Sequence, residues 1–131
     1  MDLLGPSLEH YLNRYKKFSL NAVIAIAHQL ITRLRIVHRK HLIHRDIKPE
    51  NILTSPEANS NLVYLIDYGL GKLYRNRTTH IHIPYAEDKN LTGTARYASS
   101  NCHKGVQSSR RDDLENLYYV LLHLLIGRLP W

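Results

Sequence analysis

The sequence predicts an α+β domain that is mainly helical, with short strands around a polar loop. Two segments, residues 19–38 and residues 109–125, carry apolar side chains at helical spacing. Between them, residues 42–66 hold short apolar runs on either side of a polar stretch, a pattern typical of short strands. With 131 residues, the chain has room for one domain.

Two helices are predicted in the first part of the chain. A short helix follows the turn at residues 5–7, because Leu8, Leu12 and Tyr15 fall on one helical face. Ser19 is a suitable N-cap for a second helix that we expect to run to about His38. This helix carries apolar residues at helical spacing: Leu20, Val23, Ile24, Ala27, Leu30, Ile31, Leu34 and Val37.

Short strands are predicted next, at residues 42–43, 52–53 and 62–66, around the polar residues 44–51. Residues 67–105 show no sustained period, so we expect a long irregular segment. Segments of that kind inside compact domains usually serve function or are disordered.

A last helix begins near Ser109, because residues 109–112 fit a capping box and acidic residues suit a helix N-terminus. Gly127 and Pro130 end it. Apolar residues occupy nearly every face of this predicted helix: Leu114, Leu117, Tyr118, Leu121, Leu122, Leu124 and Leu125. We therefore expect this helix to be buried in the centre of the domain.

Composition narrows the possible partners and compartment. A single cysteine excludes an internal disulfide and a cysteine-based zinc site. The net charge of +7 favours acidic partners: phosphate groups, acidic peptides, nucleic acid or a membrane surface. The uncharged apolar stretch 116–127 is too short to span a bilayer, and the first residues do not fit a signal peptide. We expect no membrane partner and a location in the cytoplasm, the nucleus or both.

The residues that carry chemistry lie in two motifs. Residues 44–51 fit the pattern H-R-D-x-K-x-x-N, and Asp67-Tyr68-Gly69 follows at the end of an apolar run. These motifs, in this order, are typical of enzymes that transfer a phosphoryl group from ATP. The alternative, a solvated polar turn, does not account for their joint spacing.

Phosphoryl transfer is mostly a matter of positioning and charge neutralisation. Asp46 would accept the proton of the attacking hydroxyl, and Lys48 would place its ammonium beside the γ-phosphate. Asn51 and Asp67 would supply oxygen ligands to Mg²⁺, a hard cation. Thr94 could hydrogen-bond both Asp46 and Lys48 and hold the loop for substrate.

The chain resembles the casein kinase I family of serine/threonine protein kinases. Besides the two motifs, four stretches carry the resemblance: residues 3–9 (LLGPSLE), 82–85 (HIPY), 89–99 (KNLTGTARYAS) and 109–115 (SRRDDLE). The resemblance implies a protein-kinase-like fold in which residues 1–131 form a partial kinase domain, most of a helical large lobe. The small lobe and the later large-lobe helices would be missing, and no G-x-G-x-x-G loop occurs in the sequence.

The resemblance also implies ligands and further site residues. Asp2 and Leu4 fall at the hinge that binds adenine, and Leu53 and Ile66 would lie beneath the adenine ring. Arg45, Lys72 and Arg96 match positions that bind an anion, which suits acidic or already phosphorylated protein substrates. Tyr68 replaces the usual phenylalanine, a change that removes no catalytic group.

Three functions compete at this stage. The first is a non-specific serine/threonine kinase of casein kinase I type that uses ATP and Mg²⁺. The second is a catalytically inactive kinase fragment that acts as a binding module. The third, a basic nucleic-acid-binding domain, is favoured by charge alone. We expect little activity from residues 1–131 alone, because nothing in them resembles the glycine-rich loop or the strand lysine of the family.

Overall fold

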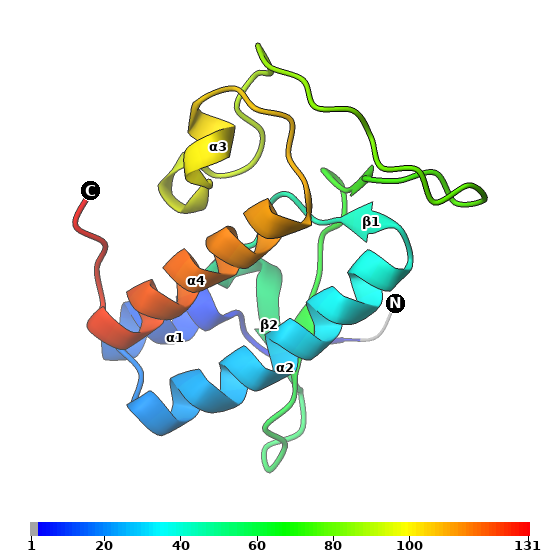
Figure 1. Ribbon diagram of the computed structural model, residues 1–131. Helices are drawn as coiled ribbons and strands as arrows, with labels where there is room; N and C mark the ends of the chain where they lie inside the picture. The colour runs from blue at the N-terminus through cyan, green and yellow to red at the C-terminus, as the bar shows by residue number, and fades with distance from the viewer. Residues whose placement is uncertain (1–2) are drawn as a thin grey trace.

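The computed structural model describes residues 3–131, in which helices pack with two small two-stranded β-sheets (Figure 1). The helices are α1 (Leu8–Tyr15), α2 (Leu20–Arg39), α3 (Ser100–His103) and α4 (Arg110–Ile126). The strands are β1 (Leu42–Ile43), β2 (Ile52–Thr54), β3 (Val63–Leu65) and β4 (Lys72–Leu73). Two 3₁₀ turns complete the set, η1 (Pro49–Asn51) and η2 (Ala95–Tyr97). The predicted α+β class is confirmed.

The first two helices both begin at a serine cap, which was predicted for Ser19 and not for Ser7. Ser7 Oγ accepts a hydrogen bond from His10 N, and Ser19 Oγ accepts one from Ala22 N. Each bond satisfies a backbone donor that the first helical turn leaves without a partner. The second helix therefore starts as predicted and ends one residue later than His38.

Both two-stranded sheets are antiparallel, and they fix the positions of the polar loops. β2 pairs with β3 in a register that sets Ile52 opposite Leu65 and Leu53 opposite Tyr64. β1 pairs with β4, with Leu42 opposite Leu73. The strands at 42–43, 52–53 and 62–66 were predicted, whereas β4 lies in the segment that was expected to be irregular.

The core lies where α2 and α4 pack against each other and against the β2–β3 hairpin. Figure 1 shows the two helices side by side, with β2 beside them. The most deeply buried apolar side chains are at most 1% exposed: Leu8, Leu30, Leu34, Ile43, Ile47, Ile52, Val120 and Leu124, together with the Tyr74 ring. This core holds the loop between β1 and β2 from below.

The last helix differs from the prediction on one point. The capping box is present, since Ser109 N donates to Asp112 Oδ2 at 2.7 Å, and Gly127 ends the helix in the left-handed region. A helix of this pattern is normally buried on every side, whereas within residues 3–131 Leu114 is 49% and Tyr118 59% exposed. The α2 helix and the main core cover one side of α4 and leave the other uncovered.

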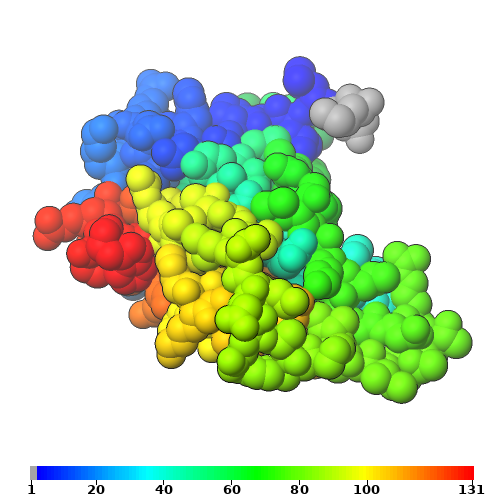
Figure 2. All heavy atoms as spheres, turned by 90° about the horizontal axis from the view of Figure 1, so that it is seen from above, coloured from blue at the N-terminus to red at the C-terminus, as the bar shows by residue number. Residues whose placement is uncertain are grey.

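The segment 67–105 is largely irregular, as expected, and is interrupted by β4, η2 and the single turn of α3. In Figure 2 its green and yellow atoms spread over the face that is turned to the viewer. By length and composition, α2 could also cross a membrane, but core helices of soluble proteins pass the same test. In this structure α2 contacts α4, β1 and β3.

Candidate active site

The polar loop that follows β1 carries the predicted catalytic residues. Ile47 and Pro49, on either side of Lys48, are buried, so the loop is anchored in the core. Pro49 opens the η1 turn, a position where a proline costs no backbone hydrogen bond. The loop thus presents Asp46 and Lys48 from a fixed backbone.

Asp46 is the centre of the site, and both of its carboxylate oxygens are engaged. Oδ1 accepts hydrogen bonds from Thr94 N at 2.9 Å and from Thr94 Oγ1 at 2.8 Å. Oδ2 lies 2.9 Å from Lys48 Nζ and 3.3 Å from Asn51 Nδ2. The Thr94 hydroxyl accepts in turn from Lys48 Nζ at 3.2 Å. The predicted bonds from Thr94 to Asp46 and Lys48 are therefore present.

These contacts set the charges of the pair. Burial alone would raise the pKa of Asp46, but the hydrogen bonds from Lys48 and Thr94 outweigh it and hold that pKa below its ordinary value. The hydrogen bond to Asp46 raises the pKa of Lys48. At neutral pH the site therefore holds a carboxylate, which can accept a proton, beside an ammonium group.

Asn51 and Asp67 lie next to each other because of a backbone contact. Ile66 N donates to Asn51 O at 3.0 Å, which fixes the following residue, Asp67, beside the loop. Asn51 Nδ2 donates a hydrogen bond to Asp46 O at 2.9 Å, so Asn51 Oδ1 is the side-chain atom that can bind a metal ion. Asp67 is exposed, and its Oδ1 accepts from Gly69 N at 3.1 Å. An amide oxygen and a carboxylate fit Mg²⁺, which binds few protein oxygens besides phosphates and water.

The residues predicted beneath the adenine lie on the β2–β3 hairpin. Ile52 and Leu65 face the core as a buried pair, so Leu53 stands on the opposite face of β2 and is half-buried, as is Ile66. Gly5 N donates to Thr54 O at 2.9 Å, which places Leu4 at the end of β2. Asp2, the other predicted hinge residue, lies outside the described residues.

A comparison with family models agrees with this geometry. The model of the protein kinase domain matches residues 2–131. The chain belongs to the protein kinase family. Kinases of this family generally use ATP and Mg²⁺, and the oxygen donors of Asn51 and Asp67 suit that cation. In this kinase domain both carboxylate oxygens of Asp46, the predicted catalytic residue, are hydrogen-bonded.

Asp113 braces the catalytic loop of the kinase domain, a role that sequence reasoning missed. Its side chain is 1% exposed. Asp113 Oδ2 accepts from His44 N at 2.9 Å and contacts His38 Nε2 at 2.8 Å, while Oδ1 accepts from Arg45 N at 2.9 Å. The sequence indicated Asp113 only as an acid suited to a helix N-terminus.

Arg45 adopts a backbone conformation that is uncommon for arginine, with φ at 70°. The surrounding structure holds it there, because Arg45 N donates to Asp113 and Arg45 Nε donates to Leu70 O at 2.6 Å. Asp67, with φ at 62°, is also in the left-handed region. Such residues cluster at functional sites of folded proteins, where neighbouring contacts maintain them.

The predicted anion-binding residues come together only in part. Arg45, Lys72 and Lys89 line one cavity of about 170 Å³, where Lys72 Nζ donates to Gln107 Oε1 at 2.9 Å. Arg96 does not line this cavity. The η2 turn carries Arg96 toward the end of the chain, where its carbonyl accepts from Trp131 Nε1. Lys89, which was not predicted as an anion contact, is the third basic residue of the cavity.

Proposed function

We propose that this kinase domain is of the casein kinase I type and phosphorylates serine and threonine hydroxyls. The observation that carries the proposal is the Asp46 carboxylate, which Thr94 and Lys48 hold from two sides. The resemblance of residues 82–85, 89–99 and 109–115 to casein kinase I supports the subfamily. The substrates would be acidic or previously phosphorylated proteins.

In this mechanism Asp46 orients the substrate hydroxyl and accepts its proton, since its lowered pKa keeps it ionised at neutral pH. Lys48 keeps its proton and faces the negative charge that develops during transfer. When bound, ATP supplies the γ-phosphoryl group, and Mg²⁺ neutralises the charge on it. Asn51 and Asp67 would hold the cation, and Leu53, Ile66 and Leu4 would contact the adenine.

The basic cavity supports the choice of substrate. Arg45, Lys72 and Lys89 line it, and none of the side chains around it is acidic in the described part of the chain. Carboxylate or phosphate groups of a substrate would form charge-assisted hydrogen bonds there. Arg96 stays a candidate for a separate anion contact on η2.

A chimera tests the proposal, because the sequence has no counterpart of the glycine-rich loop that covers the phosphates of ATP in kinases. Residues 1–131 would be joined to the small lobe of a casein kinase I and assayed with Mg-ATP. The chimera should phosphorylate a serine peptide rich in glutamate faster than the same peptide with glutamine in place of glutamate. Equal rates on the two peptides would contradict the proposed substrate class.

A second function, a binding module without catalysis, is favoured by one observation. Leu114, Tyr118 and Ile126 leave an apolar side of α4 exposed, and exposed apolar surface of this kind often binds a partner. A chimera that binds Mg-ATP and peptide but transfers no phosphate would favour this reading. The nucleic-acid function still rests on net charge alone.

A further inference from the structure

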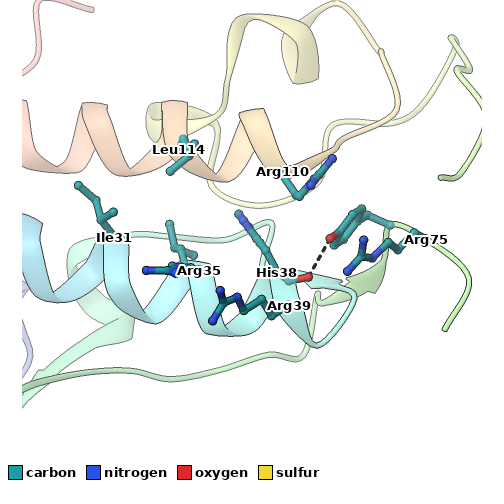
Figure 3. A pocket seen from close by; sticks show the side chains of 9 residues that line it. Ile31, Arg35, His38, Arg39, Arg75, Arg110 and Leu114 are labelled. Atoms are coloured by element: carbon teal, nitrogen blue, oxygen red, sulfur yellow. Dashed lines mark hydrogen bonds between the residues drawn. The ribbon is translucent and has the colours of Figure 1, made fainter. Parts of the chain in front are cut away.

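A groove of about 350 Å³ lies between α2, α4 and the residues that follow β4, away from the catalytic loop (Figure 3). Ile31 of α2 and Leu114 of α4 are on its two walls. None of the side chains assigned above to catalysis, to Mg²⁺, to adenine or to the anion cavity lines it. The groove is therefore a separate feature, and an inference from it does not rest on kinase activity.

The groove is apolar inside, with a buried floor and walls that are open to solvent. Leu34 lies at its base and is 1% exposed, whereas Ile31 is 52% and Leu114 49% exposed. Apolar side chains that stay exposed inside a concave surface favour a ligand with an apolar group of its own. A small inorganic anion would leave this floor uncovered.

The rim is basic. Arg35 and Arg39 extend from α2, one turn apart, and Arg75 and Arg110 lie at the other end of the groove. Arg110 stands 4.7 Å and Arg75 5.4 Å from the centre of the Tyr74 ring. Within residues 3–131, none of these four guanidinium groups has a carboxylate within 4.0 Å. Arg75 Nε donates to His41 Nδ1 at 2.8 Å, and no carboxylate of the described residues balances the positive charge of the four groups.

The nearest buried acid does not neutralise this rim. Asp113 faces His38, which lines the groove, but its oxygens are taken by His38 Nε2 and by the backbone amides of His44 and Arg45. Tyr74 OH is also engaged, since it donates to His38 O at 2.8 Å (Figure 3). The groove therefore combines a preformed floor with a surplus of positive charge.

We propose that this groove binds an acidic segment of a partner protein, with an apolar side chain between Ile31 and Leu114, above the buried Leu34, and carboxylates or phosphates on the arginine rim. Charge complementarity and the apolar floor together select this occupant. A nucleic-acid backbone would match the arginines, but its phosphates and sugars offer nothing for the floor. Arginine pairs well with both carboxylate and phosphate groups.

The test measures binding to the full chain of residues 1–131 by fluorescence anisotropy. The probe is a fluorescein-labelled peptide of about eight residues that carries a leucine between glutamates, and a second probe has serine in place of the leucine. Arg35→Gln with Arg39→Gln removes two rim charges. Arg14→Gln with Arg128→Gln is the matched control, because it removes the same charge from exposed arginines outside the groove.

The groove pair should weaken binding of the leucine peptide about tenfold or more, and the control pair about twofold or less. Leu114→Ser should weaken binding of the leucine peptide but not of the serine peptide. Tyr118→Ser, also on the exposed side of α4, should change the binding of neither peptide. Equal losses from the two arginine pairs would show a general positive field and overturn the proposal. Absence of peptide binding by the unaltered chain would also overturn it. So would a single-stranded oligonucleotide that binds more tightly than the peptide and whose affinity falls further than the peptide's when Arg35→Gln and Arg39→Gln are introduced together.

Discussion

The carboxylate of Asp113, in the first turn of α4, accepts a hydrogen bond from the backbone amide of His44 at 2.9 Å. The two residues are 69 positions apart in the sequence. The same carboxylate accepts from the next amide, of Arg45, whose backbone is in the left-handed region. The start of the last helix thus maintains the conformation of the catalytic loop.

Asp113→Ala should destabilise the domain strongly, because it leaves two backbone N–H groups of the loop without their acceptor. Each buried donor without a partner costs about 1–3 kcal/mol, so we expect a loss of roughly 2–6 kcal/mol in the free energy of unfolding. Urea denaturation followed by circular dichroism measures it. Glu57→Ala, in an exposed loop, is the control and should change this free energy by less than about 0.5 kcal/mol. A loss no larger than in the control would show that Asp113 does not hold the loop.

Thr94→Val should lower catalysis without unfolding the chain. It removes a hydroxyl that donates to Asp46 at 2.8 Å and accepts from Lys48 at 3.2 Å, at nearly constant volume. A hydrogen bond to a charged group contributes about 1.5–3 kcal/mol, so kcat of the small-lobe chimera should fall about tenfold or more. Thr78→Val, an exposed threonine in the same segment 67–105, should leave kcat within about twofold. Equal rates for both variants would argue against the role given to Thr94.

The stability of the domain should decrease as the pH falls below neutral, partly because of His123. Burial, followed by the charge of Arg96, lowers the pKa of His123 below 6.5. The unfolded chain then takes up a proton at a higher pH than the folded chain, so stability is complete above pH 6.5 and falls toward the folded pKa. His123→Gln should therefore flatten the change in Tm between about pH 7.5 and 5, while His28→Gln, exposed on α2, should not. If the change in Tm with pH is the same in His123→Gln as in the unaltered chain, a group other than His123 takes up the proton.

Local patterns predicted the long helices, three of the strands and the residues grouped around Asp46. Ser7, Ser19 and Ser109 cap helices because a side-chain oxygen reaches an amide only three residues away. The grouping of Asp46 with Lys48, Asn51 and Thr94 followed from motif spacing and the family resemblance. Their catalytic and ligand-binding roles stay predictions.

Long-range contacts could not be predicted in the same way. Asp113 was recognised only for its local suitability at a helix start, since nothing near it in the sequence indicates His44 as a partner. Leu114 and Tyr118 have the apolar character of core residues, yet no described element covers them. Arg96 lies two residues beyond Thr94, but the η2 turn separates it from the cavity of Arg45 and Lys72. In each case the packing of distant segments decides the outcome.

The most direct test of the central claim is the turnover of the small-lobe chimera with Asp46 replaced by Asn. The amide keeps the shape of the side chain but cannot take up the proton of the substrate hydroxyl. Using an acidic serine peptide and saturating Mg-ATP, we expect kcat to fall by about 10²–10⁴ with little change in KM for the peptide. Undiminished kcat in Asp46→Asn would contradict the assignment of Asp46 as the catalytic base.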